Sequence, residues 1–141
     1  MKILLAVDGS DVSLRAVRSL VEHAQWFREP PEVHVLHVHP PIPVGLALQH
    51  VSRETLDRHY REEGEQALAP ALAVLEQAGL KPIRHIHVGQ PADVIVHQAR
   101  ELGCDCIGLG THGRGSVGNA LLGSVASRVL HLAHVPVLVS K

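Results

Sequence analysis

The stretch of this sequence best suited to chemistry is glycine-rich, Gly108-Leu109-Gly110-Thr111-His112-Gly113-Arg114-Gly115-Ser116-Val117-Gly118. It follows an apolar run and precedes a helical pattern, so its backbone N–H groups would lie near the N-terminus of a helix. Exposed N–H groups and the positive end of a helix dipole both attract an anion such as a phosphate. A flexible turn also uses glycines, but five of them between positions 108 and 118 favour an anion-binding loop.

Three named motifs can be compared with this segment, and none fits. Its glycine spacing matches the dinucleotide fingerprint, but no Asp or Glu follows Asp105 to hold a ribose. A Walker loop requires Gly-Lys-Ser/Thr, and no lysine lies between Lys81 and Lys141. A nucleophile elbow needs glycine two residues before its serine, where Arg114 precedes Ser116. The ligand is therefore not assigned by any of these motifs.

The distribution of charge also favours an anionic ligand. Residues 106–141 contain Arg114, Arg128, Lys141 and three histidines but no carboxylate side chain. Chance and a buried last strand are the alternative explanation. Over the whole chain, 13 basic and 14 acidic residues give a formal charge of −1, which argues against a general nucleic-acid binder.

Length and composition indicate one soluble domain spanning residues 1–141, 45% of whose residues are hydrophobic. The N-terminal apolar run stops at Asp8, too early for a signal peptide or a membrane span. The two cysteines, Cys104 and Cys106, are too close together in the sequence to form a disulfide that stabilises a small secreted domain. We therefore expect a cytoplasmic protein without membrane contact.

Strand and helix patterns alternate along the chain and must position the glycine-rich loop. Strands are expected at residues 2–8, 33–38, 83–88, 104–110 and 135–139. Helices are expected to begin at Ser10 or Asp11, at Ser52, at Pro91 and at about Ser124, and Pro70 predicts a kink or a break in the second of them. This order implies an open parallel sheet with helices on both faces, whose ligands bind at the carboxyl ends of the strands.

The spacing Gly110-x2-Gly113-x9-Gly123-Ser124 resembles the nucleotide-binding signature of the universal stress protein family. Four other segments resemble the family's first strand, third helix start, fourth strand and last strand: Ile3-Leu4-Leu5-Ala6-Val7-Asp8-Gly9-Ser10, Gly89-Gln90-Pro91-Ala92-Asp93-Val94-Ile95, Cys104-Asp105-Cys106-Ile107-Gly108-Leu109-Gly110-Thr111-His112-Gly113 and Val135-Pro136-Val137-Leu138-Val139. The chain departs from the family pattern at Cys106 and Gly108, where bulkier residues are common.

The resemblance implies a Rossmann-like fold of the adenine nucleotide alpha hydrolase type, strand order 3-2-1-4-5, and an ATP site between strands 1 and 4. The implied site residues are Ala6, Val7 and Asp8 beside the nucleoside, Val38 against adenine, Leu109, Gly110, His112 and Gly113 beside the ribose and phosphates, and Gly123, Ser124 and Val125 at the phosphates. Of these, Gly123 would donate its backbone N–H and Ser124 its hydroxyl. Arg114 is a further candidate, either meeting a terminal phosphate or facing water.

We expect a nucleotide-binding stress or regulatory protein that holds ATP, with or without Mg²⁺, and hydrolyses it little or not at all. The sequence supplies no Walker lysine, acidic Mg²⁺ cluster or activated nucleophile. A slow phosphohydrolase or phosphotransferase using Asp8 and His112 is one alternative. A dimeric interaction module that no longer binds nucleotide is the other.

The last strand predicts a homodimer. In the expected order it is an edge strand, with Val135, Val137 and Val139 alternating with Pro136 and Leu138. An exposed apolar edge invites pairing with another chain, and a proline is tolerated near such an edge.

Histidine and cysteine pairs are the remaining candidates for chemistry. His37 and His39, and likewise His85 and His87, are two apart on a strand and would share a face. Each pair could hold Zn²⁺ or Ni²⁺, but the spacing supplies no third or fourth ligand, so no metal site is predicted. The cysteine pair is expected to be buried and inert rather than a redox or metal pair.

Overall fold

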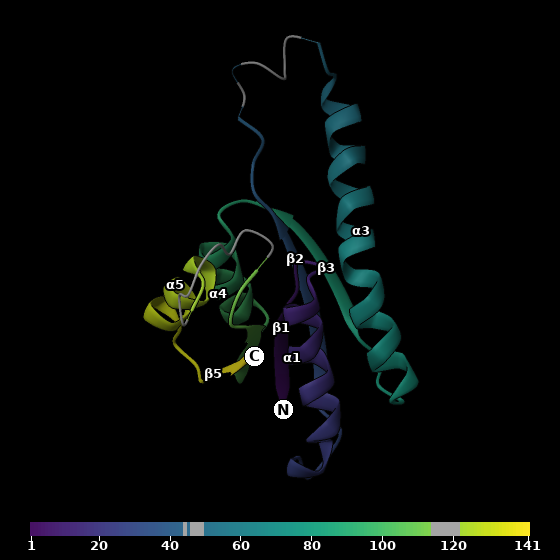
Figure 1. Ribbon diagram of the computed structural model, residues 1–141, viewed down its shortest axis with the longest axis vertical. Coiled ribbons are helices and arrows are strands. Elements are labelled where there is room, and N and C mark those ends of the chain that lie inside the picture. Colours follow the sequence, from purple (N-terminus) through teal and green to yellow (C-terminus); the bar gives the residue numbers. More distant parts are fainter. Residues whose placement is uncertain (44, 46–49, 114–121) are drawn as a thin grey trace.

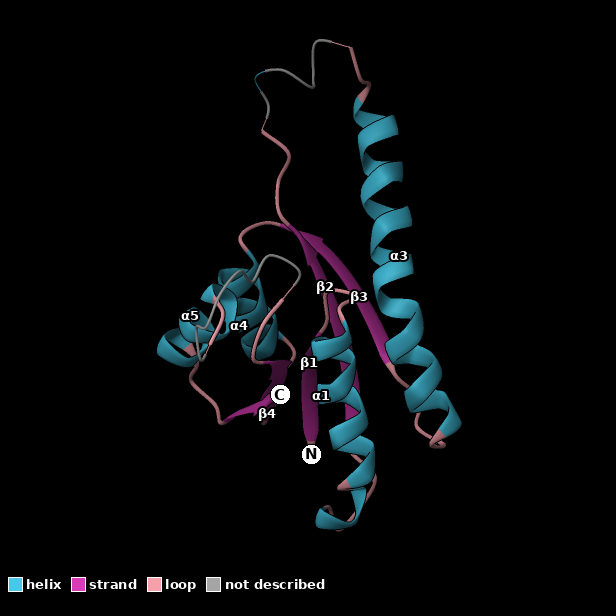
Figure 2. Ribbon diagram, viewed as in Figure 1, coloured by secondary structure: helices cyan, strands magenta, loops and turns pink. Residues whose placement is uncertain are grey.

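Five parallel strands form one sheet with the order β3-β2-β1-β4-β5 (Figures 1 and 2). The computed structural model describes residues 1–43, 45, 50–113 and 122–141. The strands are β1 (Lys2–Ala6), β2 (Glu32–His39), β3 (Ile83–Val88), β4 (Cys106–Gly110) and β5 (Val137–Ser140). The predicted open α/β sheet and its strand order are confirmed.

Helices cover both faces of the sheet (Figure 1). One face packs against α1 (Asp11–Glu22) and α3 (Arg53–Gln77), and the other against α4 (Pro91–Glu101) and α5 (Ser124–Leu132). A short 3-10 helix, η1 (Ala24–Trp26), follows α1. Within the described parts of the chain, no helix combines the length and the apolar character needed to cross a membrane.

The central strand β1 divides the core into two layers. Ile3 and Leu5 point into the layer that α1 and α3 cover, whereas Leu4 points into the layer under α4 and α5. Ile3 and Leu4 are completely buried, and a buried side chain of this size contributes about 1.5–3 kcal/mol. Because both faces are covered, β1 is a continuous apolar run rather than an alternating one.

Serine side chains begin two of the helices as predicted. Ser10 precedes α1 and accepts a hydrogen bond from the backbone N–H of Ser13 at 3.2 Å. Ser52 precedes α3 and accepts from the backbone N–H of Thr55 at 3.2 Å. Each bond satisfies an N–H group that the helix itself cannot use.

The long helix is not broken at Pro70, so the prediction of two pieces is wrong. α3 runs as one helix from Arg53 to Gln77. Its Leu68, Ala71 and Leu75 are buried against the sheet on both sides of the proline. This packing outweighs the loss of the backbone hydrogen bond that a proline cannot donate.

The buried face of α5 differs from the expected one. Ala126 and Val129 are buried, whereas Val125 and Leu132 are 36% and 38% exposed. The spacing of Val125, Val129 and Leu132 would by itself place these three side chains on one apolar face. α5 packs against α4 and β5, and this packing buries the face that carries Ala126 and Val129.

Several strand ends also differ from the predicted ones. β1 ends at Ala6 rather than Asp8, because Asp8 instead begins a turn in which its Oδ1 accepts from the N–H of Ser10 at 3.0 Å. β5 begins at Val137, after Pro136, which has no N–H for the sheet. The turn moves Asp8 out of the sheet and to the end of β1.

Candidate functional site

A cavity of about 610 Å³ lies at the carboxyl ends of β1, β2 and β4. β1 is paired with β2 on one side and β4 on the other. The chain leaves β1 through α1 on one face and reaches β4 through α4 on the opposite face. The winding reverses here, and open α/β sheets bind ligands at such a point.

Eleven of the twelve predicted site residues line this single cavity. They are Ala6, Val7, Asp8, Val38, Leu109, Gly110, His112, Gly113, Gly123, Ser124 and Val125. The twelfth, Arg114, lies outside the described residues. The structure therefore brings together positions that are up to 119 residues apart, from Ala6 to Val125.

The turn after β1 and the loop after β4 are in close contact. A β-carbon at Gly113 would lie 2.6 Å from Oδ2 of Asp8, which is closer than β-carbons lie to other atoms in proteins. Gly9 has φ of +78°, a conformation that glycine adopts without the steric penalty of other residues. These two glycines allow the Asp8 carboxylate to lie between the two segments at the cavity wall.

The N-terminus of α5 faces the cavity through Gly123, Ser124, Val125 and Ala126. No side chain caps this end among the described residues, and its first turn contains no acid. The N–H groups of the first helical turn have no partner inside the helix. The cavity therefore has the positive end of a helix dipole on one wall.

The backbone N–H of Gly123 is already used, which corrects the role expected for it. It donates to the carbonyl oxygen of Thr111 at 2.7 Å. An anion in the cavity would instead meet the N–H groups that follow it in α5. The bond fixes the start of α5 to the loop after β4, a tertiary contact that glycine spacing alone does not reveal.

Polar side chains that the sequence interpretation missed also line the cavity. They are Ser13, His37, His39, Glu63 and Thr111. The Nδ1 of His37 lies 3.0 Å from the carbonyl oxygen of Val7 and must donate to it, because a carbonyl only accepts. Glu63 lies inside α3, and no local motif marks it, because only the packing of α3 beside β2 brings it to the cavity.

The two cysteines lie away from the cavity, Cys106 on β4 and Cys104 just before it, and they are buried in different layers of the core. Burial raises the pKa of both Cys104 and Cys106. A thiol with a raised pKa contains little of the reactive thiolate at neutral pH. This supports the interpretation of the two cysteines as inert core residues.

The chain is a doubly wound α/β protein, and its cavity lies at the switch point where such sheets bind small ligands. Comparison with known proteins gives the family. The model of the universal stress protein family matches residues 1–141. The chain therefore belongs to the universal stress protein family.

Three relatives illustrate how closely the chain follows this family. Universal stress protein MJ0531 of Methanocaldococcus jannaschii is 39% identical over 141 residues, covering 99% of this chain and 81% of the relative. The structure of MJ0577 from the same organism has a TM-score of 0.84 at 30% identity, covering 99% of this chain and 94% of that one. An Archaeoglobus fulgidus universal stress protein in complex with dAMP has a TM-score of 0.72 at 27% identity, covering 100% and 98%.

Proposed function

We propose that this protein binds ATP in the cavity at the ends of β1, β2 and β4, and acts in a cytoplasmic stress response or its regulation. The observation that carries the proposal is the convergence of eleven predicted residues on one cavity beside the uncapped start of α5. A volume of about 610 Å³ is ordinary for a small-molecule site. The dAMP complex of the Archaeoglobus fulgidus relative supports an adenine nucleotide as the ligand class.

The two ends of the cavity suit the two ends of a nucleotide. Val38, Leu36 and Ile95 supply an apolar wall for the base. Asp8 offers a carboxylate that can accept hydrogen bonds from ribose hydroxyls. At the other end, the first turn of α5 and the Ser124 hydroxyl offer donors to the phosphates. In this arrangement the base lies near β2 and the phosphates near α5.

The proposed role is retention of ATP with little or no hydrolysis. The sequence contains no lysine between Lys81 and Lys141 to neutralise the transferring phosphoryl group. Asp8 and His112 both line the cavity, which keeps slow phosphohydrolase activity as the second candidate. Mg²⁺ would accompany the triphosphate.

Calorimetric titration with ATP, AMP and adenosine tests the proposal directly. We expect binding of ATP to be saturable with one site per chain. Absence of binding of all three at millimolar concentration would refute the assigned site. Incubation with radiolabelled ATP separates the two candidates, because a storage or signalling protein returns ATP unchanged and a hydrolase returns ADP and phosphate.

We also propose that the protein forms a homodimer through β5. Among the described strands, β5 is at the edge of the sheet and pairs only with β4. Leu138 on it is 47% exposed, and Leu130 and Leu132 of the preceding helix are 43% and 38% exposed. An edge strand with apolar side chains around it gains from pairing with a second copy.

A further inference from the structure

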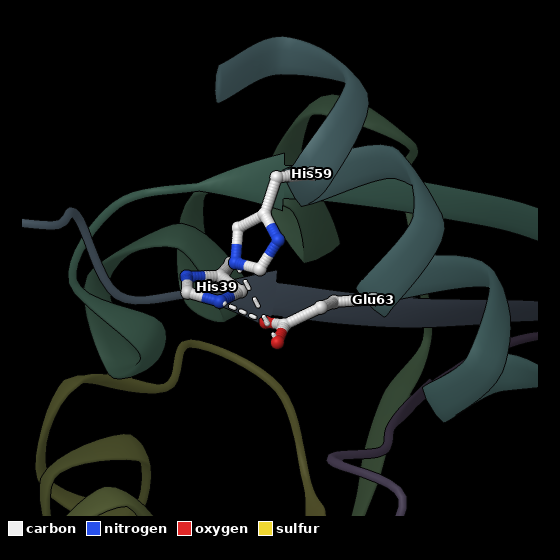
Figure 3. Close-up of side chains that lie close together, drawn as sticks. All are labelled: His39, His59 and Glu63. Atoms are coloured by element: carbon white, nitrogen blue, oxygen red, sulfur yellow. Dashed lines mark hydrogen bonds and ion pairs between the residues drawn. The ribbon is translucent and has the colours of Figure 1, made fainter. Parts of the chain in front are cut away.

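Two histidines and a glutamate from β2 and α3 lie close together (Figure 3), and two of them, His39 and Glu63, line the cavity. His39 is the last residue of β2, and His59 and Glu63 lie one turn apart on α3. Each offers one ligand atom, and these atoms all lie within 4.8 Å of one another. Among the residues that the structure describes, no other three potential metal ligands come this close together.

The hydrogen bonds of His39 fix which of its nitrogens carries hydrogen. Its Nδ1 lies 2.7 Å from the carbonyl oxygen of Pro40, and a carbonyl only accepts, so Nδ1 is the donor. In the neutral ring, Nε2 then presents a lone pair. That lone pair faces Oε2 of Glu63 at 2.5 Å. Two lone pairs at this distance repel, so a positive species, either a proton or a metal ion, must lie between them.

This arrangement matches the way proteins prepare a histidine for a metal. A metal-binding histidine usually donates its other ring N–H to a backbone carbonyl or a carboxylate, which fixes the tautomer and the ring orientation. The ring of His39 is also held by Tyr60, whose ring centre lies 4.7 Å away. The hydroxyl of Tyr60 in turn accepts from the N–H of Ile42 at 3.0 Å.

A second histidine cluster shows why the first one is different. His34 lies between Glu32 and His85, with contacts of 2.9 Å on both ring nitrogens. With both rings neutral and Glu32 ionised, all three groups are satisfied, because His85 donates to His34 and His34 donates to Glu32. No additional cation is needed there. At His39 and Glu63, a neutral ring and an ionised carboxylate leave two acceptors facing each other.

His59 completes the coordination set. Its Nε2 lies 3.6 Å from Oε1 of Glu63, and its side chain is 48% exposed, so it can rotate. Zn²⁺ with ligands at about 2.0–2.2 Å brings neighbouring ligand atoms to roughly 3.3–3.6 Å in tetrahedral geometry. Small rotations of exposed side chains are enough to reach these separations.

We propose that His39, His59 and Glu63 bind a zinc-class transition metal ion at the border of the cavity. Two imidazoles and one carboxylate suit Zn²⁺, whereas Mg²⁺ and Ca²⁺ prefer oxygen ligands alone. Three protein ligands leave a fourth position for water or another donor. Because His39 and Glu63 also line the cavity, the ion would lie beside the bound ligand. Its two nitrogen ligands distinguish this site from one for the Mg²⁺ that would accompany a triphosphate.

Titration of tag-free protein with Zn²⁺ alone tests the proposal. We expect one ion per chain, and Co²⁺ should give the intense visible bands of a four-coordinate site. His59→Gln and Glu63→Gln should each weaken binding at least about 100-fold, since losing a group that merely supports a ligand typically costs about 10–100-fold. Both side chains are exposed, so both variants should keep the wild-type circular dichroism spectrum.

The matched control is His97→Gln, which removes an exposed histidine from α4 and should bind Zn²⁺ as the wild type does. The proposal is overturned if one-to-one binding is absent below about 100 μM, the concentration equivalent to about −5.5 kcal/mol. It is also overturned if the ligand variants bind like wild type, if His97→Gln weakens binding as much as they do, or if millimolar Mg²⁺ displaces the ion. The Zn²⁺ titration contains no nucleotide, so a negative result would not count against the proposed nucleotide site.

Discussion

Replacing Gly123 with valine is the sharpest test of the phosphate end of the cavity. A β-carbon at this position would lie 3.3 Å from the carbonyl oxygen of Thr111 and 3.4 Å from Cα of His112. Both neighbours are backbone atoms, which cannot rotate aside as a side chain can. The two further methyl groups of valine add to the crowding. The start of α5 must therefore move away from the loop after β4.

The substitution should spare the fold while it harms binding. Gly123 has φ of −71° and ψ of 166°, extended values that valine adopts without strain. Crowding, and not a forbidden backbone conformation, is thus the cause of any effect. A displaced start of α5 moves several hydrogen-bond donors away from the phosphates at once. We therefore expect the affinity for ATP to fall at least tenfold, which corresponds to about 1.4 kcal/mol.

Calorimetry with three ligands shows where on the nucleotide the loss occurs. ATP should lose the most affinity, AMP less, and adenosine little, since adenosine has no phosphate to meet α5. Ala73→Val is the control, because it introduces the same residue on an exposed part of α3 away from the cavity. Equal loss for adenosine and ATP would place the phosphates elsewhere, and unchanged ATP binding would refute the reasoning.

Three further predictions concern the nucleoside end of the cavity, pH and assembly. Asp8→Ala should weaken adenosine and ATP by similar factors in the same titrations, because Asp8 is proposed to act at the ribose; a loss confined to ATP would contradict this. Burial, followed by the nearby positive charges of His34 and His87, lowers the pKa of His85. The unfolded chain then takes up a proton before the folded one as pH falls below about 6.5, so the free energy of unfolding is highest above this pH and decreases below it. Urea denaturation between pH 7.5 and about pH 5 should show this decrease, and His85→Gln should reduce its slope; an unchanged slope would show that other groups cause it. Leu138→Glu should convert a dimer to a monomer at tens of micromolar by light scattering, because a charge would be buried at the proposed β5 contact; a wild-type monomer, or a dimer that survives the change, would exclude this interface.

The arrangement of the sheet and the positions around the cavity could be predicted from the sequence. Short buried strands, serine caps and the proline at the start of α4 are local signals, and local backbone energetics decide them. The glycine spacing after β4 also predicted where a ligand could approach. Parallel strands have their carboxyl ends at one edge of the sheet, so the sequence predicts one site for residues as distant as Ala6 and Val125, and both line the cavity.

Contacts between elements were decided only by the tertiary structure. Pro70 does not break α3, because packing of that helix on the sheet outweighs one missing hydrogen bond. The N–H of Gly123 is bonded to Thr111, which no spacing rule foresees. His39 lacked a third ligand in the sequence, since Glu63 follows it by 24 residues. The rotation and placement of α3 beside β2 bring the two together, and those depend on side-chain packing across the whole layer rather than on any local pattern.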